Sequence, residues 1–156
     1  MPDSHPAPAP GSTRDQALDR LARAAYSLSA ADSRLRGRAT RSPGALSLTH
    51  ARALRVLADT GPLTIGQLAA ATETTGAATT QLVNGLAAAG YVVRERPADD
   101  KRSVRVSLTD TGRRRHHERQ TALARALGTT LAHHDITALD GATDVLRQLA
   151  VIYDQL

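Results

Sequence analysis

Residues Gly90–Gly112 have the sequence GYVVRERPADDKRSVRVSLTDTG, which carries the clearest structural signal in the chain. Tyr91–Arg96 is rich in residues that favour strands, Pro97–Ser103 is polar, and Val104–Leu108 alternates apolar with polar side chains. Two such runs on either side of a polar turn are typical of a β-hairpin. The sequence therefore predicts a two-stranded hairpin with a charged tip.

Two short helices are predicted immediately before the hairpin. Thr64, followed three residues later by Gln67, forms a capping box that starts the first helix. The second helix starts at Thr74 or Thr75, where a hydroxyl can cap the free N–H groups. It ends at Gly90, because a residue without a Cβ suits the left-handed position after a helix.

A short helix, a turn, a second helix and a basic hairpin follow one another in a winged helix-turn-helix. We therefore expect a mainly α fold with a small two- or three-stranded β wing. The second helix would enter the major groove of DNA, where Asn and Gln can bridge adenine N6 and N7. The alternative is a solvated polar face without a binding role. The helix residues expected at DNA are Thr64, Thr74, Thr75, Gly76, Ala77, Thr79, Thr80, Gln81 and Asn84.

The hairpin carries five basic residues against three acidic ones, a surplus of two positive charges. Arg102 at the tip can reach into a narrow minor groove, where the negative potential is enhanced. We expect Asp100 to hold that guanidinium by a charge-assisted hydrogen bond. The remaining cations would neutralise phosphates, which adds affinity without sequence preference. The hairpin residues expected at DNA are Arg94, Arg96, Asp100, Lys101 and Arg102.

Composition narrows the class of protein. The chain has 156 residues, a net charge of +5 and a pI near 10.6, which fits one small basic domain. Phe, Trp and Cys are absent, so the core is small, oligomerisation is expected, and thiol chemistry is excluded. No apolar run is long enough for a membrane span and no signal peptide precedes the domain, so a cytoplasmic protein without membrane contact is expected.

Three motifs follow one another in the hairpin and just after it: Gly90-Tyr91-Val92, Asp100-Lys101-Arg102-Ser103-Val104 and Val106-Ser107-Leu108-Thr109 with Gly112. With these motifs, the region from Ser47 to Gly112 resembles the MarR (multiple antibiotic resistance regulator) family of bacterial winged-helix transcription factors. The resemblance implies a homodimer on a pseudo-palindromic double-stranded operator, and it places Asp100 and Arg102 at the wing-tip acid and minor-groove arginine positions.

Two residues of the second helix depart from the family pattern. Gln81 stands where many members have a basic residue, and Gly85 stands where a charged one is common. The helix is thus nearly neutral, so affinity is expected to depend more on the wing and on backbone N–H groups near Thr64 and Thr75. Gly85 also costs roughly 1 kcal/mol of helix propensity relative to Ala, which suggests close packing or a tolerated weakness.

Four segments are expected along the chain. Residues 1–13 form a disordered Pro- and Ala-rich arm, and 14–46 form an N-terminal dimerisation helix with its linker. Residues 47–112 form the winged DNA-binding domain, and 113–156 form C-terminal dimerisation helices. The apolar residues expected at the dimer interface are Leu18, Leu21, Leu139, Leu146, Leu149, Ile152 and Tyr153.

The resemblance also implies a regulated repressor, because many members release DNA when a small aromatic or phenolic anion enters a cleft beside the winged domain. Tyr26, His50, Arg52 and Arg113 are the candidate residues for such an effector. The alternatives are that Tyr26 belongs to the core and that Arg113 is a solvated or phosphate-contacting cation.

Other function classes find less support. Adjacent histidines, as in His116-His117 and His133-His134, point about 100° apart on a helix and do not pair on one metal ion, so no metal site is expected. A metal-responsive regulator and a winged helix that binds another protein remain the alternatives. Phosphate loops and nucleophile motifs do not appear, so neither an enzyme nor a cofactor is expected.

Overall fold

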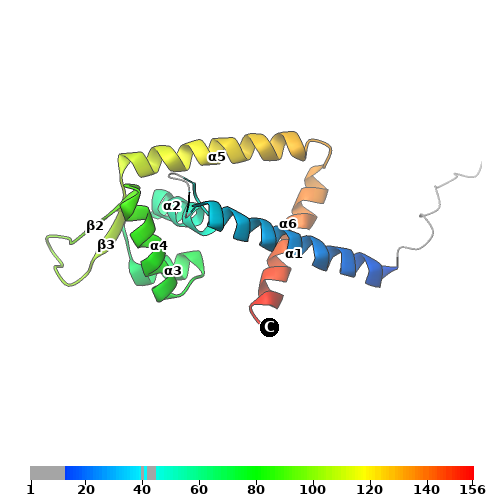
Figure 1. Ribbon diagram of the computed structural model, residues 1–156, viewed down its shortest axis with the longest axis horizontal. Coiled ribbons are helices and arrows are strands. Elements are labelled where there is room, and N and C mark those ends of the chain that lie inside the picture. Colours follow the sequence, from blue (N-terminus) through cyan, green and yellow to red (C-terminus); the bar gives the residue numbers. More distant parts are fainter. Residues whose placement is uncertain (1–12, 40, 42–44) are drawn as a thin grey trace, which may run out of the picture.

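The computed structural model describes residues 13–39, 41 and 45–156, so most of the expected arm lies outside the described residues. In Figure 1 the short helices and the sheet form one body with the hairpin at one side. The helix α5 starts above the strands and runs along the top of the view, and α1 extends on the side away from the hairpin. The mainly α fold with a β wing is confirmed. Its elements are α1 (Arg14–Ala39), α2 (Leu48–Thr60), β1 (Leu63–Thr64), α3 (Ile65–Thr72), α4 (Gly76–Ala88), β2 (Val92–Glu95), β3 (Arg105–Leu108), α5 (Asp110–Thr130) and α6 (Ile136–Tyr153).

Hydroxyl and carboxylate caps start the helices. Thr64 and Gln67 form the expected capping box, in which the Thr64 hydroxyl accepts from the Gln67 N–H at 3.2 Å and the Thr64 N–H donates to Oε1 at 3.0 Å. Thr75, and not Thr74, caps α4. Thr13 makes a reciprocal pair of hydrogen bonds with Gln16 at the start of α1, so it belongs to that helix and not to the arm. Each such cap stabilises its helix by about 1 kcal/mol.

The sheet has three antiparallel strands in the order β1-β3-β2. Val92 lies opposite Leu108 and Glu95 opposite Arg105, which makes β2 and β3 the predicted hairpin. The third strand, β1, pairs Leu63 with Val106. It is only two residues long, which is too short for an alternation of apolar and polar side chains to predict it from the sequence.

The core of the described chain lies between residues 46 and 108. Gly90 adopts the expected left-handed conformation, with φ +75°, and turns the chain from α4 into β2. Outside this core, α1, α6 and most of α5 carry apolar side chains that remain exposed or half-buried. The buried core residues are Leu46, Ala53, Leu54, Leu57, Leu68, Leu82, Val83, Leu86, Tyr91, Val92, Val106 and Leu108.

A tight junction joins the wing to α5. The Thr109 N–H donates to the Tyr91 carbonyl at 3.1 Å, and its hydroxyl donates to the Gly90 carbonyl at 2.6 Å. Gly112, one turn into α5, lies so close that a Cβ there would stand 2.0 Å from the Tyr91 oxygen. Only glycine fits this position without moving the backbone of β2 or α5.

Gly85, unlike Gly112, has room for a Cβ atom. A Cβ at Gly85 would meet the His50 Nε2 atom at 3.5 Å, which is an ordinary van der Waals contact. Of the two explanations that the sequence offered for this glycine, the structure therefore favours a tolerated weakness of α4 over close packing.

We predict that Gly112→Ala lowers the free energy of unfolding by at least about 2 kcal/mol, because the added methyl group overpacks the junction. Gly128→Ala, in the same helix and with open space around the added Cβ, is the matched control and should raise stability by up to about 1 kcal/mol. Urea unfolding at one fixed protein concentration measures both variants. Equal midpoints would contradict the prediction.

Candidate nucleic-acid interface

The outer face of α4 is polar and largely free of bulky side chains. Ala77, Thr80, Gln81 and Asn84 are exposed there. The Thr80 hydroxyl donates to the Gly76 carbonyl at 2.9 Å, so toward solvent it presents a methyl group and an oxygen acceptor. This face has the shape and chemistry for contact with base edges.

Thr79 does not belong to that face, and its predicted outward position is wrong. The residue is 1% exposed. Its hydroxyl donates to the Thr75 carbonyl at 2.9 Å and lies 2.7 Å from the Thr74 hydroxyl, which is itself half-buried. Both threonines therefore stabilise the start of α4 from inside, since their hydroxyls are occupied within the domain.

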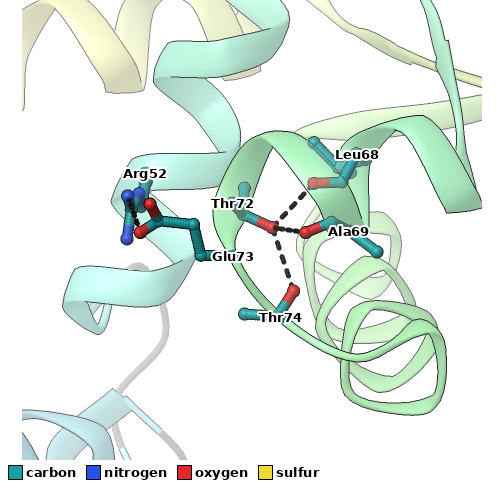
Figure 2. Close-up of polar contacts among 6 residues, drawn as sticks. All are labelled: Arg52, Leu68, Ala69, Thr72, Glu73 and Thr74. Carbon is teal, nitrogen blue, oxygen red and sulfur yellow. Dashed lines mark hydrogen bonds and ion pairs between the residues drawn. The ribbon is translucent and has the colours of Figure 1, made fainter. Parts of the chain in front are cut away.

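The turn between α3 and α4 is held by a hydroxyl chain centred on Thr72 (Figure 2). The buried Thr72 hydroxyl lies 2.7 Å from the Leu68 carbonyl, 3.4 Å from the Ala69 carbonyl and 3.0 Å from the Thr74 hydroxyl. The Thr74 hydroxyl in turn makes a hydrogen bond with the Thr79 hydroxyl. Since buried hydroxyls without partners are costly, this chain ties the two helices into one rigid unit.

An ion pair lies on the outside of the same turn. Arg52 of α2 contacts Glu73 with Nη2 and Oε2 2.5 Å apart (Figure 2). Glu73 has φ +54°, a left-handed conformation that costs a non-glycine residue roughly 1–2 kcal/mol. Both side chains are more than half exposed, so the pair contributes at most about 1 kcal/mol. A competing anion can therefore displace Glu73 at little cost.

At the tip of the wing, Asp100 organises the backbone. Its carboxylate accepts from the Arg102 N–H at 3.0 Å and from the Ser103 hydroxyl at 2.8 Å. The expected bond to the Arg102 guanidinium is absent from the described contacts, so that expectation is wrong. The Asp100 carboxylate closes the turn at the wing tip by binding the Arg102 backbone N–H and the Ser103 hydroxyl. Because it does not bind the Arg102 guanidinium, that group remains available to another partner.

Hydrogen bonds from Ser103 and from the Arg102 N–H lower the pKa of Asp100 below its ordinary value of 3.8, with a smaller contribution from the charge of Arg105. The wing turn is therefore held by an ionised carboxylate at neutral pH.

A hydrogen bond between side chains joins the wing to α4. Arg94 of β2 donates through Nη2 to Oδ1 of Asn84 at 2.5 Å. Arg96, Lys101 and Arg102 are exposed along the rest of the wing. The predicted wing cations thus lie on one solvent-facing element, and one of them contacts the polar face of α4.

The four candidate effector residues come from three helices and already have neighbours. The His50 ring lies 2.6 Å from the Ser47 hydroxyl, and burial lowers its pKa. Arg52 is paired with Glu73, and Arg113 lies 3.6 Å from Asp110. Tyr26 is 75% exposed on α1, so it is not a core residue of the single chain. None of the described contacts joins two of these four residues.

Two further absences concern only the part of the chain that the structure describes. Within it, no three His, Cys, Asp or Glu side chains come together as a metal site. None of its helices has both the length and the apolar character needed to cross a bilayer.

Sequence reasoning missed two residues of the interface. Ser103 follows Asp100 by three residues, and this Asp-x-x-Ser spacing is a local turn signal that could have identified it. Glu73 carries no such signal, because a left-handed glutamate and its partner 21 residues away follow from the tertiary structure alone.

The order of the helices and the three-stranded sheet define a winged helix-turn-helix fold. Residues 46–103 match the sequence model of the MarR family, so the resemblance found in the sequence is confirmed for that part of the chain. A search of curated proteins finds no match.

Solved structures support the same assignment of the fold. The transcriptional regulator BldR from Sulfolobus solfataricus is 23% identical, with 94% of this chain and 100% of that chain covered and a TM-score of 0.63. A MarR family protein from Bacillus stearothermophilus is 24% identical (92% and 99% covered, TM-score 0.61). BpsR from Bordetella bronchiseptica is 21% identical (85% and 98% covered, TM-score 0.63). These structures show the same fold as this chain, and the match to the family model implies DNA binding.

The Asp100 turn leads to a pH prediction. The carboxylate should titrate below its ordinary pKa of 3.8, so its contribution to wing order is present above that pH and is lost as the pH falls through the lowered pKa. Ser103→Ala removes the largest cause and should raise the pKa of Asp100. Carboxyl-carbon NMR titration measures the shift. Ser107→Ala, which removes a hydroxyl bonded to Glu95, is the control and should leave the pKa of Asp100 unchanged.

Proposed function

We propose that the chain is a homodimeric, ligand-responsive transcriptional repressor that binds a pseudo-palindromic operator in the cytoplasm. The observation that carries DNA binding is the polar face of α4 linked to an arginine-bearing wing through Asn84 and Arg94. In this proposal α4 enters the major groove and Arg102 enters the adjacent minor groove. The wing cations and the helix starts near Thr64 and Thr75 contact phosphates.

The basic charge lies in the wing and not on α4. Gly76, Ala77, Thr80, Gln81 and Asn84 are all uncharged. Affinity and its dependence on salt would therefore come mostly from the wing, whereas α4 would contribute preference among bases. Two of the expected donors, the N–H groups of Thr64 and Gln67, are engaged in the capping box, which leaves the wing a still larger share of the phosphate contacts.

Homodimerisation is supported by the apolar side chains that the single chain leaves uncovered. Leu146 on α6 is 51% exposed, and it lies on a helix none of whose residues is buried. Apolar side chains repeated along one amphipathic helix gain burial when a second copy covers them. The proposed interface includes Leu18, Leu21, Leu139, Leu146, Leu149, Ile152 and Tyr153, of which Leu21 and Leu149 are half-buried and the others are exposed.

The proposed effector is a small aromatic or phenolic anion that binds near Tyr26, His50, Arg52 and Arg113. The exposed Arg52–Glu73 pair supports this proposal, because an anion that attracts Arg52 would release Glu73 and change how α2 contacts the turn between α3 and α4. The DNA binding of BpsR, the Bordetella neighbour, is regulated by 6-hydroxynicotinic acid, an effector of this chemical type.

Selection of bound duplexes from a random pool at near-physiological salt tests DNA binding. We expect a pseudo-palindrome with half-sites about one helical turn apart. Arg102→Ala should weaken binding to the selected site by about 1–3 kcal/mol, with greater loss on sites whose minor groove is narrow.

Arg96→Ala is the control for general phosphate contact. It should weaken all sequences alike and reduce the slope of affinity against salt by about one. Equal losses for Arg102→Ala on A/T-rich and G/C-rich flanks would contradict the minor-groove role. A slope near zero for the unmodified protein would favour the alternative of a protein-binding module.

Replacing Leu146 by Asp should dissociate the dimer, because it buries a charge in the apolar interface. DNA binding should fall together with the dimer, since the two half-site contacts are no longer linked. Sedimentation and duplex titration on the same samples measure both effects. Gln148→Glu adds a negative charge to the polar face of α6 and should leave the dimer intact. A monomeric Leu146→Asp variant that binds as tightly as the unmodified protein would refute the proposed linkage.

A further inference from the structure

The hydrogen bond between Asn84 and Arg94 connects the two elements that the proposed function brings to DNA. Residues two apart on a strand face the same side, so Arg94 lies on the face of β2 that buries Val92. Val106, opposite Arg94 on β3, is also buried. Along that face Val92 is buried and Arg94, the next residue, is exposed. The Arg94 guanidinium binds the exposed Asn84 on α4.

The chemistry of the two side chains determines how the amide is oriented. A guanidinium has N–H donors and no acceptor, so the Asn84 atom that it contacts is the carbonyl oxygen. The Asn84 oxygen therefore points toward β2, and its NH₂ group points away from the wing. Arg94 thus removes the twofold uncertainty of orientation that an exposed asparagine amide has.

This orientation changes which base edge the pair can read. Adenine offers N7 as an acceptor and N6 as a donor, so its two-bond recognition requires the Asn oxygen to accept from N6. One of the two lone pairs of that oxygen already accepts from the Arg94 guanidinium, and the positive charge beside it disfavours a second N–H donor such as adenine N6. Guanine offers two acceptors, N7 and O6. The free NH₂ of Asn84 and the remaining N–H groups of Arg94 form a donor array that complements such an edge.

We infer that Asn84 and Arg94 together read a guanine in the major groove, with Arg94 as the specificity-determining residue that sets the polarity of the amide. The inference rests on the proposed function, because it requires α4 to lie in that groove. It also replaces the adenine contact that Asn84 alone would predict.

The test compares selected binding sites for the unmodified protein, Asn84→Ala, Arg94→Met and Arg96→Met. Asn84→Ala identifies the base position, because its preference there should be lost. At that position the unmodified protein should prefer guanine over adenine by about tenfold. Arg94→Met frees the amide oxygen and should shift the preference toward adenine. Arg96→Met removes the same charge from the same wing and should keep the guanine, with only a uniform loss of affinity.

Three results would overturn the inference while leaving the proposed function intact, because a binding site is still selected in each case. The first is a preference for adenine in the unmodified protein at the position that Asn84→Ala relaxes. The second is a preference unchanged by Arg94→Met, and the third is an identical shift in Arg96→Met. Unmodified protein that selects no site at all would instead overturn the proposed function and this inference with it. Thermal unfolding of each variant confirms that the fold is retained, as expected for exposed residues.

Discussion

The contact between Gly112 and the Tyr91 carbonyl is the constraint on which the arrangement of the protein depends. At this junction the end of α4, the start of β2 and the start of α5 meet, and the Thr109 hydroxyl closes it by donating to Gly90. The strand β2 carries the wing, whereas α5 leads toward α6. A displacement at the junction would therefore change the orientation of the wing relative to the proposed dimer helices.

The apolar residues are divided between two surfaces. The core around Leu54, Leu68 and Val106 is complete within the winged domain, although Tyr91 is the sole aromatic residue in it. The side chains of α1, α5 and α6 have no comparable cover in the single chain. This division is consistent with a domain that folds around its own core and long helices that gain their stability from association.

The interface combines rigid and easily displaced parts. The buried hydroxyl chain of Thr72, Thr74 and Thr79 holds α3 against α4, and breaking it would leave buried polar groups without partners. The Arg52–Glu73 pair lies on the same turn but is exposed to solvent and salt. Buried hydrogen bonds thus hold the interior of the turn, whereas an anion can compete with Glu73 for Arg52 at its surface. This arrangement is consistent with the proposal that an anion changes how α2 contacts the turn.

Features that depend on neighbours within a few residues could be predicted from the sequence. The Thr64 capping box and the caps at Thr75 and Asp135 were predictable because a side chain satisfies a backbone N–H three residues away. The glycine turn at Gly90 and the hairpin were predictable because a residue without a Cβ and two strand-forming runs around a polar turn are local signals.

Features that join distant residues depend on tertiary packing. It placed Thr79 inward, paired β1 with β3, set Glu73 against Arg52, and turned the Asn84 amide toward Arg94. The helical position of Thr79 suits either face until the packing of α3 against α4 is known. The free end of the Asn84 amide likewise depends on a donor ten residues away on another element. Local propensity cannot distinguish such arrangements, because their energies come from contacts that exist after the elements have packed together.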